Sequence, residues 1–358
     1  MHVPDGFINA PVSAVTGVVA AAAVAVSLRG ARRELGTSAG PGGSERTAPL
    51  AGLVAAFIFA VQMLNFPVAA GTSGHLLGGA LAAILVGPYT GVLCVSVVLL
   101  MQGVLFADGG LTALGVNITD MAIVTVLVAY ALFRGLVKVL PRRRGSVTAA
   151  SFVAALVSVP AAAVAFTAMY AIGGTTDVSL GKVASAMIGV HVLIGIGEAV
   201  ITALTVGAVI AVRPDLVYGA RGLSTPLKLR VGGELVDAPA QAPAPVAARS
   251  TKKVWITGIV ASVVLAGFVS FYASASPDGL EKVAHDKGID RKAEDHAAKD
   301  SPLADYGVKD ISDARLSGGL AGVIGVGATV VVGSGIFYVV RRRRDHGATR
   351  SGQVQETA

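Results

Sequence analysis

The sequence predicts an all-α membrane protein of about nine transmembrane helices. Of its 358 residues, 53% are hydrophobic and only 14% are charged, whereas soluble domains carry about 25% charged residues. The apolar residues gather in runs close to the ~20 residues that a helix needs to cross a bilayer. The 45 glycines suit helices that pack closely in lipid. We therefore expect a multi-pass membrane protein.

Eight apolar runs are long enough to cross a bilayer. They lie at about 10–28, 49–69, 88–106, 116–133, 148–172, 184–212, 254–273 and 317–340. A ninth run, at about 76–87, holds only about a dozen residues and ends at Gly87 and Pro88. On length alone this run could be a re-entrant segment, so its charged neighbours must decide.

The distribution of basic residues favours a ninth crossing. If 76–87 crosses, 21 of the 29 lysines and arginines fall on one side of the membrane. Those 21 lie in the segments 29–48, 134–144, 213–253 and 341–350. By the positive-inside rule this side is cytoplasmic, which places the N-terminus outside and the C-terminus in the cytoplasm. The lysines and arginines lie in short blocks between apolar runs, so we expect contact with membrane lipid and no nucleic-acid partner.

The chain divides into two helical parts. Residues 1–212 form a unit of seven predicted helices with short loops, and 213–253 is a cytoplasmic linker rich in alanine and proline. Residues 254–340 form a two-helix module, and 341–358 is a basic cytoplasmic tail. The external loop of the module, 274–316, is polar and acidic, and its charge pattern predicts a mainly solvated loop.

Signatures of an enzyme are missing from the sequence. The phosphate-binding pattern G-x-x-x-x-G-K-[ST] does not occur, since Gly181-Lys182 is followed by Val183. Neither G-x-S-x-G nor H-E-x-x-H is found. The single Cys94 leaves nitrogen and oxygen as the main ligands for any metal. We recognise no cleavable leader before 10–28, so we expect the chain to keep Met1.

The first two residues form a candidate chelate. The α-amine of Met1, the amide nitrogen of His2 and the imidazole Nδ1 of His2 can close two fused rings around one ion. This nitrogen set selects tetragonal Ni(II) or Cu(II) over tetrahedral Zn(II). His75, in the glycine-rich stretch GTSGHLLGG, is the best placed remote imidazole. The alternatives remain a solvated terminal histidine, and a His75 that only bonds a carbonyl at a helix junction.

Few other polar residues lie within apolar runs. His191 and Glu198 are seven residues apart and so share one helix face. We favour a supporting hydrogen bond over direct metal ligation for this pair. Asp108 and Asn117 stand at an external helix junction, where capping of a helix is the ordinary role.

Four motifs in order resemble a known family. They are MHVPDGF at the start, NFPVAAGTSGHLLGGALAAILVGPYTG at 65–91, LFADGG followed by LGVN from 105, and HVLIGIGEAVIT at 191–202. Over about 1–212 the chain resembles the CbiM/NikM family, the substrate-binding membrane components of energy-coupling-factor transporters for nickel or cobalt. The stretch Pro277-Asp278-Gly279-Leu280-Glu281 resembles the PDGLE/CbiN-type accessory component, which is fused here to the first part.

The resemblance implies a protein of a bacterial or archaeal cytoplasmic membrane, with a metal site and a set of partners. Met1, His2 and His75 would bind the ion in one plane, with the ion as transported substrate and no cofactor. The polar residues that we expect around these ligands are Thr72, Ser73, Asn117, His191 and Glu198. The implied partners are a transmembrane coupling protein and two ATP-binding subunits that hydrolyse ATP. Every one of these candidate ligands lies within 1–212.

The choice of metal rests on departures from the pattern of the cobalt-type members, which tend to begin with Met-His-Ile-Met-Glu-Gly and to have a Cys-Ser-His-Pro-like loop. This chain has Val3-Pro4-Asp5-Gly6 and Thr72-Ser73-Gly74-His75 at these places. The difference favours nickel, with cobalt for cobalamin biosynthesis close behind. A stand-alone ion-coupled carrier would need a relay of buried carboxylates, and Glu198 is the one convincing acid. A membrane enzyme or scaffold of cobalamin biosynthesis would need an aromatic and basic pocket, whereas aromatic residues make up 5% of the chain.

Overall fold

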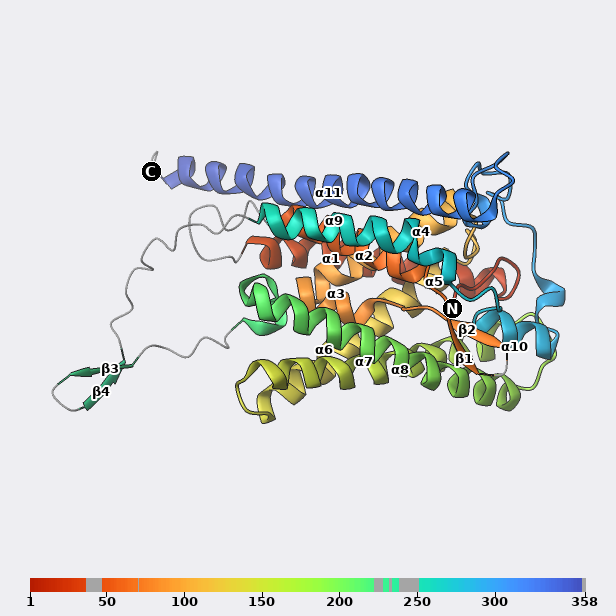
Figure 1. Ribbon diagram of the computed structural model, residues 1–358, viewed down its shortest axis with the longest axis horizontal. Coiled ribbons are helices and arrows are strands. Elements are labelled where there is room, and N and C mark those ends of the chain that lie inside the picture. Colours follow the sequence, from red (N-terminus) through yellow and green to blue (C-terminus); the bar gives the residue numbers. More distant parts are fainter. Residues whose placement is uncertain (37–46, 70, 222–227, 232–233, 238–250, 356–358) are drawn as a thin grey trace.

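The computed structural model describes residues 1–36, 47–69, 71–221, 228–231, 234–237 and 251–355. Long helices lie side by side in one bundle, with the N-terminus near one end and the C-terminus at the other (Figure 1). Within the described part, seven helices are long and apolar enough to cross a membrane. They are Ala10–Leu35, Pro88–Leu105, Leu114–Val139, Arg144–Gly173, Leu180–Val212, Lys252–Tyr272 and Ala314–Val340. The predicted all-α membrane fold is confirmed.

The helices follow the predicted runs, with longer ends. The long elements are α1 (Ala10–Gly36), α4 (Pro88–Leu105), α6 (Thr125–Val139), α7 (Arg144–Gly173), α8 (Leu180–Val212), α9 (Lys252–Gly267) and α11 (Ala314–Gln355). The run predicted at 116–133 begins as a short helix, α5 (Leu114–Asn117), and passes through a π-helical segment, η1 (Ile118–Val124), into α6. A short 3-10 helix, η4 (Val269–Tyr272), extends the span of α9.

The helix predicted at 49–69 is wrong at its C-terminal end. Helix α2 covers Thr47–Gln62, and the chain then forms the strands β1 (Phe66–Ala69) and β2 (Thr72–Gly74), which pair antiparallel. Pro67 lacks an amide hydrogen and holds the residue before it in an extended conformation, so the helix cannot continue. The hairpin delivers His75 directly after β2.

The run at 76–87 contains a helix of only eight residues, α3 (Gly79–Val86), about 12 Å long. The chain nevertheless passes from one end of the bundle to the other here. His75 lies beside Met1, before the start of α1, whereas Glu34 near the end of α1 accepts hydrogen bonds from the backbone of Thr90 at the start of α4. The predicted alternation of ends is therefore kept, although a full-length helix does not form.

The helices of the second module pack directly on α2. A Cβ on Gly52 of α2 would lie 2.3 Å from the Ser334 hydroxyl of α11. A Cβ on Gly325 of α11 would lie 2.2 Å from the Phe59 ring of α2. Two glycines thus permit a close approach that larger residues would block, as is typical of helix pairs in lipid.

About half of the predicted linker lies outside the described residues. Within 213–253 the structure has the short helices η2 (Pro214–Leu216) and η3 (Tyr218–Ala220) and a hairpin of β3 (Lys228–Val231) and β4 (Glu234–Asp237). The alanine- and proline-rich residues 238–250 are outside the description, as are the last three residues of the predicted tail 341–358. The boundaries of linker and tail therefore stay predictions.

The loop of the second module, 274–316, which the sequence predicts to be external, folds over the end of the bundle that holds the N-terminus (Figure 1). It contains α10 (Gly279–Lys287) and the short helices η5 (Asp290–Lys292) and η6 (Ala304–Tyr306). Its backbone amides at Ser274, Glu294 and Asp305 donate to carbonyls of the first part. Most of the loop is exposed, as its charge pattern predicts, while its inner side packs on the N-terminal segment.

Candidate metal site

The first residues of the chain tuck inward ahead of α1. The amide of Val3 donates to Asn117 Oδ1 over 2.7 Å, and Asn117 Nδ2 donates back to the Val3 carbonyl over 3.1 Å. The Gly110 amide donates to the same carbonyl over 2.9 Å. The capping role expected for Asn117 is wrong, because its side chain is used to hold the N-terminal segment. Met1 is 2% exposed, so its amine is delivered into a buried position.

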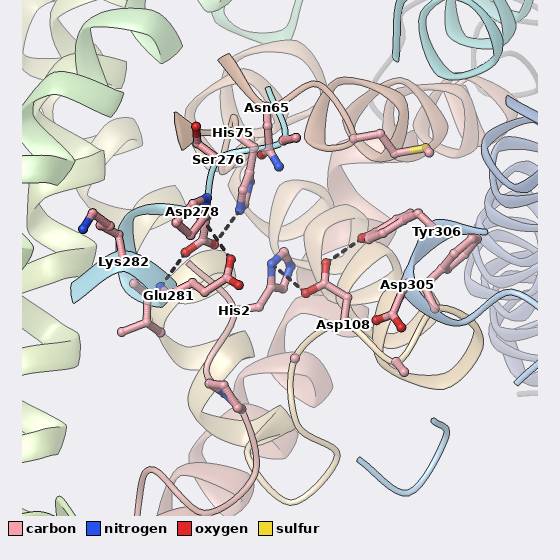
Figure 2. Close-up of a pocket in the computed structure, with 18 of the residues that line it drawn as sticks. His2, Asn65, His75, Asp108, Ser276, Asp278, Glu281, Lys282, Asp305 and Tyr306 are labelled. Atoms are coloured by element: carbon pink, nitrogen blue, oxygen red, sulfur yellow. Dashed lines mark hydrogen bonds and ion pairs between the residues drawn. The ribbon is translucent and has the colours of Figure 1, made fainter. Parts of the chain in front are cut away.

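Three possible metal-binding groups converge on this position, and Figure 2 shows two of them, the side chains of His75 and Asp278. The α-amine of Met1 lies 2.8 Å from His75 Nε2 and 2.8 Å from Asp278 Oδ2. His75 Nε2 and Asp278 Oδ2 are 3.6 Å apart. The other ring nitrogen, His75 Nδ1, lies 3.0 Å from the Leu76 carbonyl and donates to it. This bond leaves the lone pair of Nε2 directed at the amine.

Burial and charge act in opposite directions on Asp278. Burial alone would raise the pKa of its carboxyl, but the α-ammonium of Met1 and the imidazole of His75 hold that pKa well below its ordinary value. Asp278 is therefore ionised beside the amine. Sequence reasoning did not include it among the candidate ligands, although the motif that contains it, Pro277 to Glu281, was recognised.

His2 lies beside His75, with the two rings stacked. Their centroids are 5.1 Å apart and their planes are inclined by 22°. His2 Nδ1 is 3.3 Å from Asp108 Oδ1, and Nε2 is 3.1 Å from Gln102 Oε1. Binding one ion through both imidazoles in a single plane would therefore require the His2 ring to turn away from Asp108. Burial lowers the pKa of His2 to about 4, so its imidazole is neutral and able to bind a metal at neutral pH.

Glu198 supports the loop that carries His75. Its carboxylate accepts from the backbone amides of Leu77 over 2.7 Å and Gly78 over 3.1 Å, just before α3. His191, on the same face of α8, donates from Nδ1 to the Met187 carbonyl over 2.7 Å. Glu198 thus fixes the backbone on which His75 is presented. The His191 bond, in contrast, lies within α8. That this pair supports the site and does not ligate the metal stays a prediction.

The remaining neighbours connect the site to the loop 274–316 of the second module, here called the accessory loop. Thr72 is buried in β2, and the Ser73 amide donates to the Pro277 carbonyl over 2.8 Å. On the other side, the Tyr306 hydroxyl donates to Asp108 Oδ2 over 2.6 Å, and Asp108 in turn contacts His2. The capping role expected for Asp108 is thus replaced by a contact between the loop and His2.

A cavity of about 1310 Å³ opens next to these residues. It lies between the N-terminal segment, the turn at 106–110 and the accessory loop. Its acidic side chains are Asp5, Asp108, Asp278, Glu281, Asp290, Glu294 and Asp305, and its lysine and arginine are Lys282 and Arg315. A water molecule takes up about 30 Å³ of liquid, so the cavity has room for a hydrated cation. Its excess of carboxylates attracts positive charge.

Replacing Asn117 with alanine should loosen the N-terminal segment and weaken metal binding by roughly tenfold, as is usual when a partner of a ligand is lost. Titration of the purified chain with Ni(II) measures this. Asn9→Ala is the matched control, because the Asn9 side chain accepts from the Val12 amide at the start of α1 and makes no contact with Val3. Equal losses in the two variants would show that Asn117 has no particular role.

Two protein families match this chain. Residues 2–216 match the CbiM family, described as a cobalt uptake substrate-specific transmembrane region. The chain belongs to the CbiM family. Residues 252–342 match a second family, the PDGLE domain, so this CbiM-family chain carries an accessory domain on the same polypeptide.

Relatives of this CbiM-family chain are known from several organisms. A protein of Archaeoglobus fulgidus, provisionally described as a fused nickel transport protein NikMN, is 40% identical over 219 residues, covering 61% of this chain and 68% of that protein. The cobalt transport protein CbiM of Sorangium cellulosum is 32% identical over 225 residues, covering 60% of this chain and 94% of that protein. A solved structure of a truncated transition metal transporter is 26% identical with a TM-score of 0.50, covering 59% of this chain and 99% of that one.

Proposed function

We propose that the chain is the substrate-specific membrane component of an energy-coupling-factor importer that binds and takes up a transition-metal ion. Nickel is the favoured ion and cobalt is second. In this proposal the α-amine of Met1, the amide and imidazole of His2, and Nε2 of His75 bind the ion. Residues 1–212 form the binding part, 213–253 the cytoplasmic linker, and 254–340 the accessory part.

One observation carries the proposal: the buried α-amine of Met1 lies 2.8 Å from His75 Nε2. Chain termini are usually solvated, and a charged amine is costly to bury without a purpose. Asn117 and Gly110 hold the segment in place, and Glu198 holds the loop of His75. Nitrogen donors fixed at this spacing suit Ni(II) and related ions. Fused relatives that are named nickel transport proteins support the choice of ion.

The proposal places the end of the bundle with the site outside the cell. The basic segments 29–48, 134–144, 213–253 and 341–350 then face the cytoplasm, where partners would bind. These partners are a transmembrane coupling protein and two ATP-binding subunits, which supply the ATP hydrolysis. Metal analysis after growth of expressing cells with Ni(II) and Co(II) together tests the choice of ion.

Uptake of labelled Ni(II) tests the proposed machinery. Cells that express the chain together with a coupling protein and two ATPases should accumulate Ni(II), and cells that express a hydrolysis-deficient ATPase should not. Accumulation that is independent of the partners would favour the stand-alone carrier. Purified chain that binds neither ion would contradict the proposal.

A further inference from the structure

We infer that Asp278 supplies an oxygen ligand to the ion from the accessory part, so that both parts of the chain build the metal site. This inference rests on the proposed function and adds a ligand to it. The sequence predicts that every ligand lies within 1–212, and the fold brings Asp278 to Met1 across 277 positions of chain. His2, His75 and Asp278 each place one possible ligand atom within 4.8 Å of the other two.

Two of the three spacings between the donor atoms match neighbouring positions around one ion. Metal–nitrogen bonds of about 2.0–2.1 Å place two ligands at right angles about 2.9 Å apart. Met1 N lies 2.8 Å from His75 Nε2 and 2.8 Å from Asp278 Oδ2, and the third side of the triangle is 3.6 Å. An ion held by the amine and His75 would therefore have Oδ2 within reach as a further ligand, at a wider angle to Nε2 than to the amine.

The accessory domain orients this carboxylate. Asp278 caps α10, because its Oδ1 accepts from the Glu281 amide over 2.8 Å. Glu281 Oε2 accepts in turn from the Asp278 amide over 3.2 Å, which completes a capping box. One oxygen of Asp278 is thus engaged by the helix, and the other, Oδ2, accepts from the Met1 amine. The carboxylate is oriented before any ion arrives.

The rest of the motif fixes Asp278 against the bundle. Ser73, two residues before His75, binds the Pro277 carbonyl. A Cβ on Gly279 would lie 2.9 Å from Ile194 of α8, so a glycine allows this close approach. Leu280 is 1% exposed. Each residue around Asp278 therefore helps to set the distance between its carboxylate and the imidazole of His75.

Asp278→Asn separates ligation from folding. Asparagine caps helices as well as aspartate does, so Oδ1 and the capping box are kept while Oδ2 is replaced by an amide nitrogen without a lone pair for a metal. Asp286→Asn is the matched control, because it makes the same substitution on α10 at a carboxylate that pairs with Lys282 and does not line the cavity. The experiment uses the full chain, purified and loaded with Ni(II).

X-ray absorption at the nickel edge counts the ligands of the bound ion. Wild type and Asp286→Asn should show a nitrogen plane with one additional oxygen, and Asp278→Asn should show the plane alone. Titration with Ni(II) should also show weaker binding by Asp278→Asn, by roughly tenfold or more. The same ligand count in Asp278→Asn and wild type would overturn the inference and leave Asp278 as a counter-ion of the amine.

A third variant keeps the two proposals distinguishable. His75→Ala should lose most Ni(II) binding whatever Asp278 does, because it removes a nitrogen of the proposed plane. If His75→Ala loses the ion and Asp278→Asn keeps the wild-type ligand count, only the inference on Asp278 fails. If His75→Ala binds as wild type does, the proposed nitrogen site itself is wrong.

Discussion

His75→Ala should weaken the binding of Ni(II) by more than about 100-fold. Loss of a residue that only supports a ligand typically costs 10- to 100-fold, and loss of a ligand should cost more. The substitution removes Nε2, which lies 2.8 Å from the α-amine, and leaves Asp278 facing the amine alone. Equilibrium titration of the purified full chain with Ni(II) measures the change.

His285→Ala provides the matched control for this prediction. The side chain of His285 is 78% exposed on α10, so it is not oriented for a buried ion. His296→Ala is a second comparison, because its Nε2 lies 3.2 Å from the Gly109 carbonyl and its Nδ1 accepts from the Ala298 amide. Both variants should bind Ni(II) nearly as wild type does. Equal losses in all three would contradict a single buried site at His75.

One alanine inserted between Met1 and His2 should abolish high-affinity binding and uptake of Ni(II). The insertion moves the imidazole to the third position, so the amine, the next amide and the imidazole no longer close the same two rings. It also moves the amine away from His75, because Asn117 anchors the segment at Val3. Wild-type uptake in cells that carry the insertion would contradict the role of the α-amine.

An insertion after the anchored segment tests whether the effect is local. One alanine placed after Asn9, at the start of α1, lengthens the chain equally and leaves the order of Met1, His2 and Val3 unchanged. This variant should keep much more Ni(II) binding than the first. If both insertions are equally harmful, general disruption of the N-terminal segment would explain the loss in place of a broken chelate.

Sequence reasoning predicted the helices well, because each crossing needs a long apolar run. It failed where backbone geometry interrupts such a run. The apolar stretch that begins with α2 continues past Gln62 as a strand around Pro67 and not as a helix. The stretch before Gly87 forms a helix of only eight residues, α3. Apolar composition alone does not distinguish helix from extended chain once lipid no longer surrounds the segment.

The candidate site was predicted in part. Met1, His2 and His75 are brought together, and Glu198 supports the backbone of the loop that carries His75, whereas His191 bonds to Met187 within its own helix. Asp278 could not be predicted as a neighbour from position, because nothing in the sequence fixes how the accessory loop folds onto the bundle. Its polar composition suggested solvent, whereas backbone hydrogen bonds fasten it over the N-terminal segment.

Anomalous diffraction at the nickel edge, from crystals of the full chain grown with Ni(II), tests the central claim most directly. The account predicts one dominant peak within bonding distance of Met1 N and His75 Nε2, at about 2.1 Å. A dominant peak among the exposed side chains of the accessory loop, with none beside Met1, would contradict it.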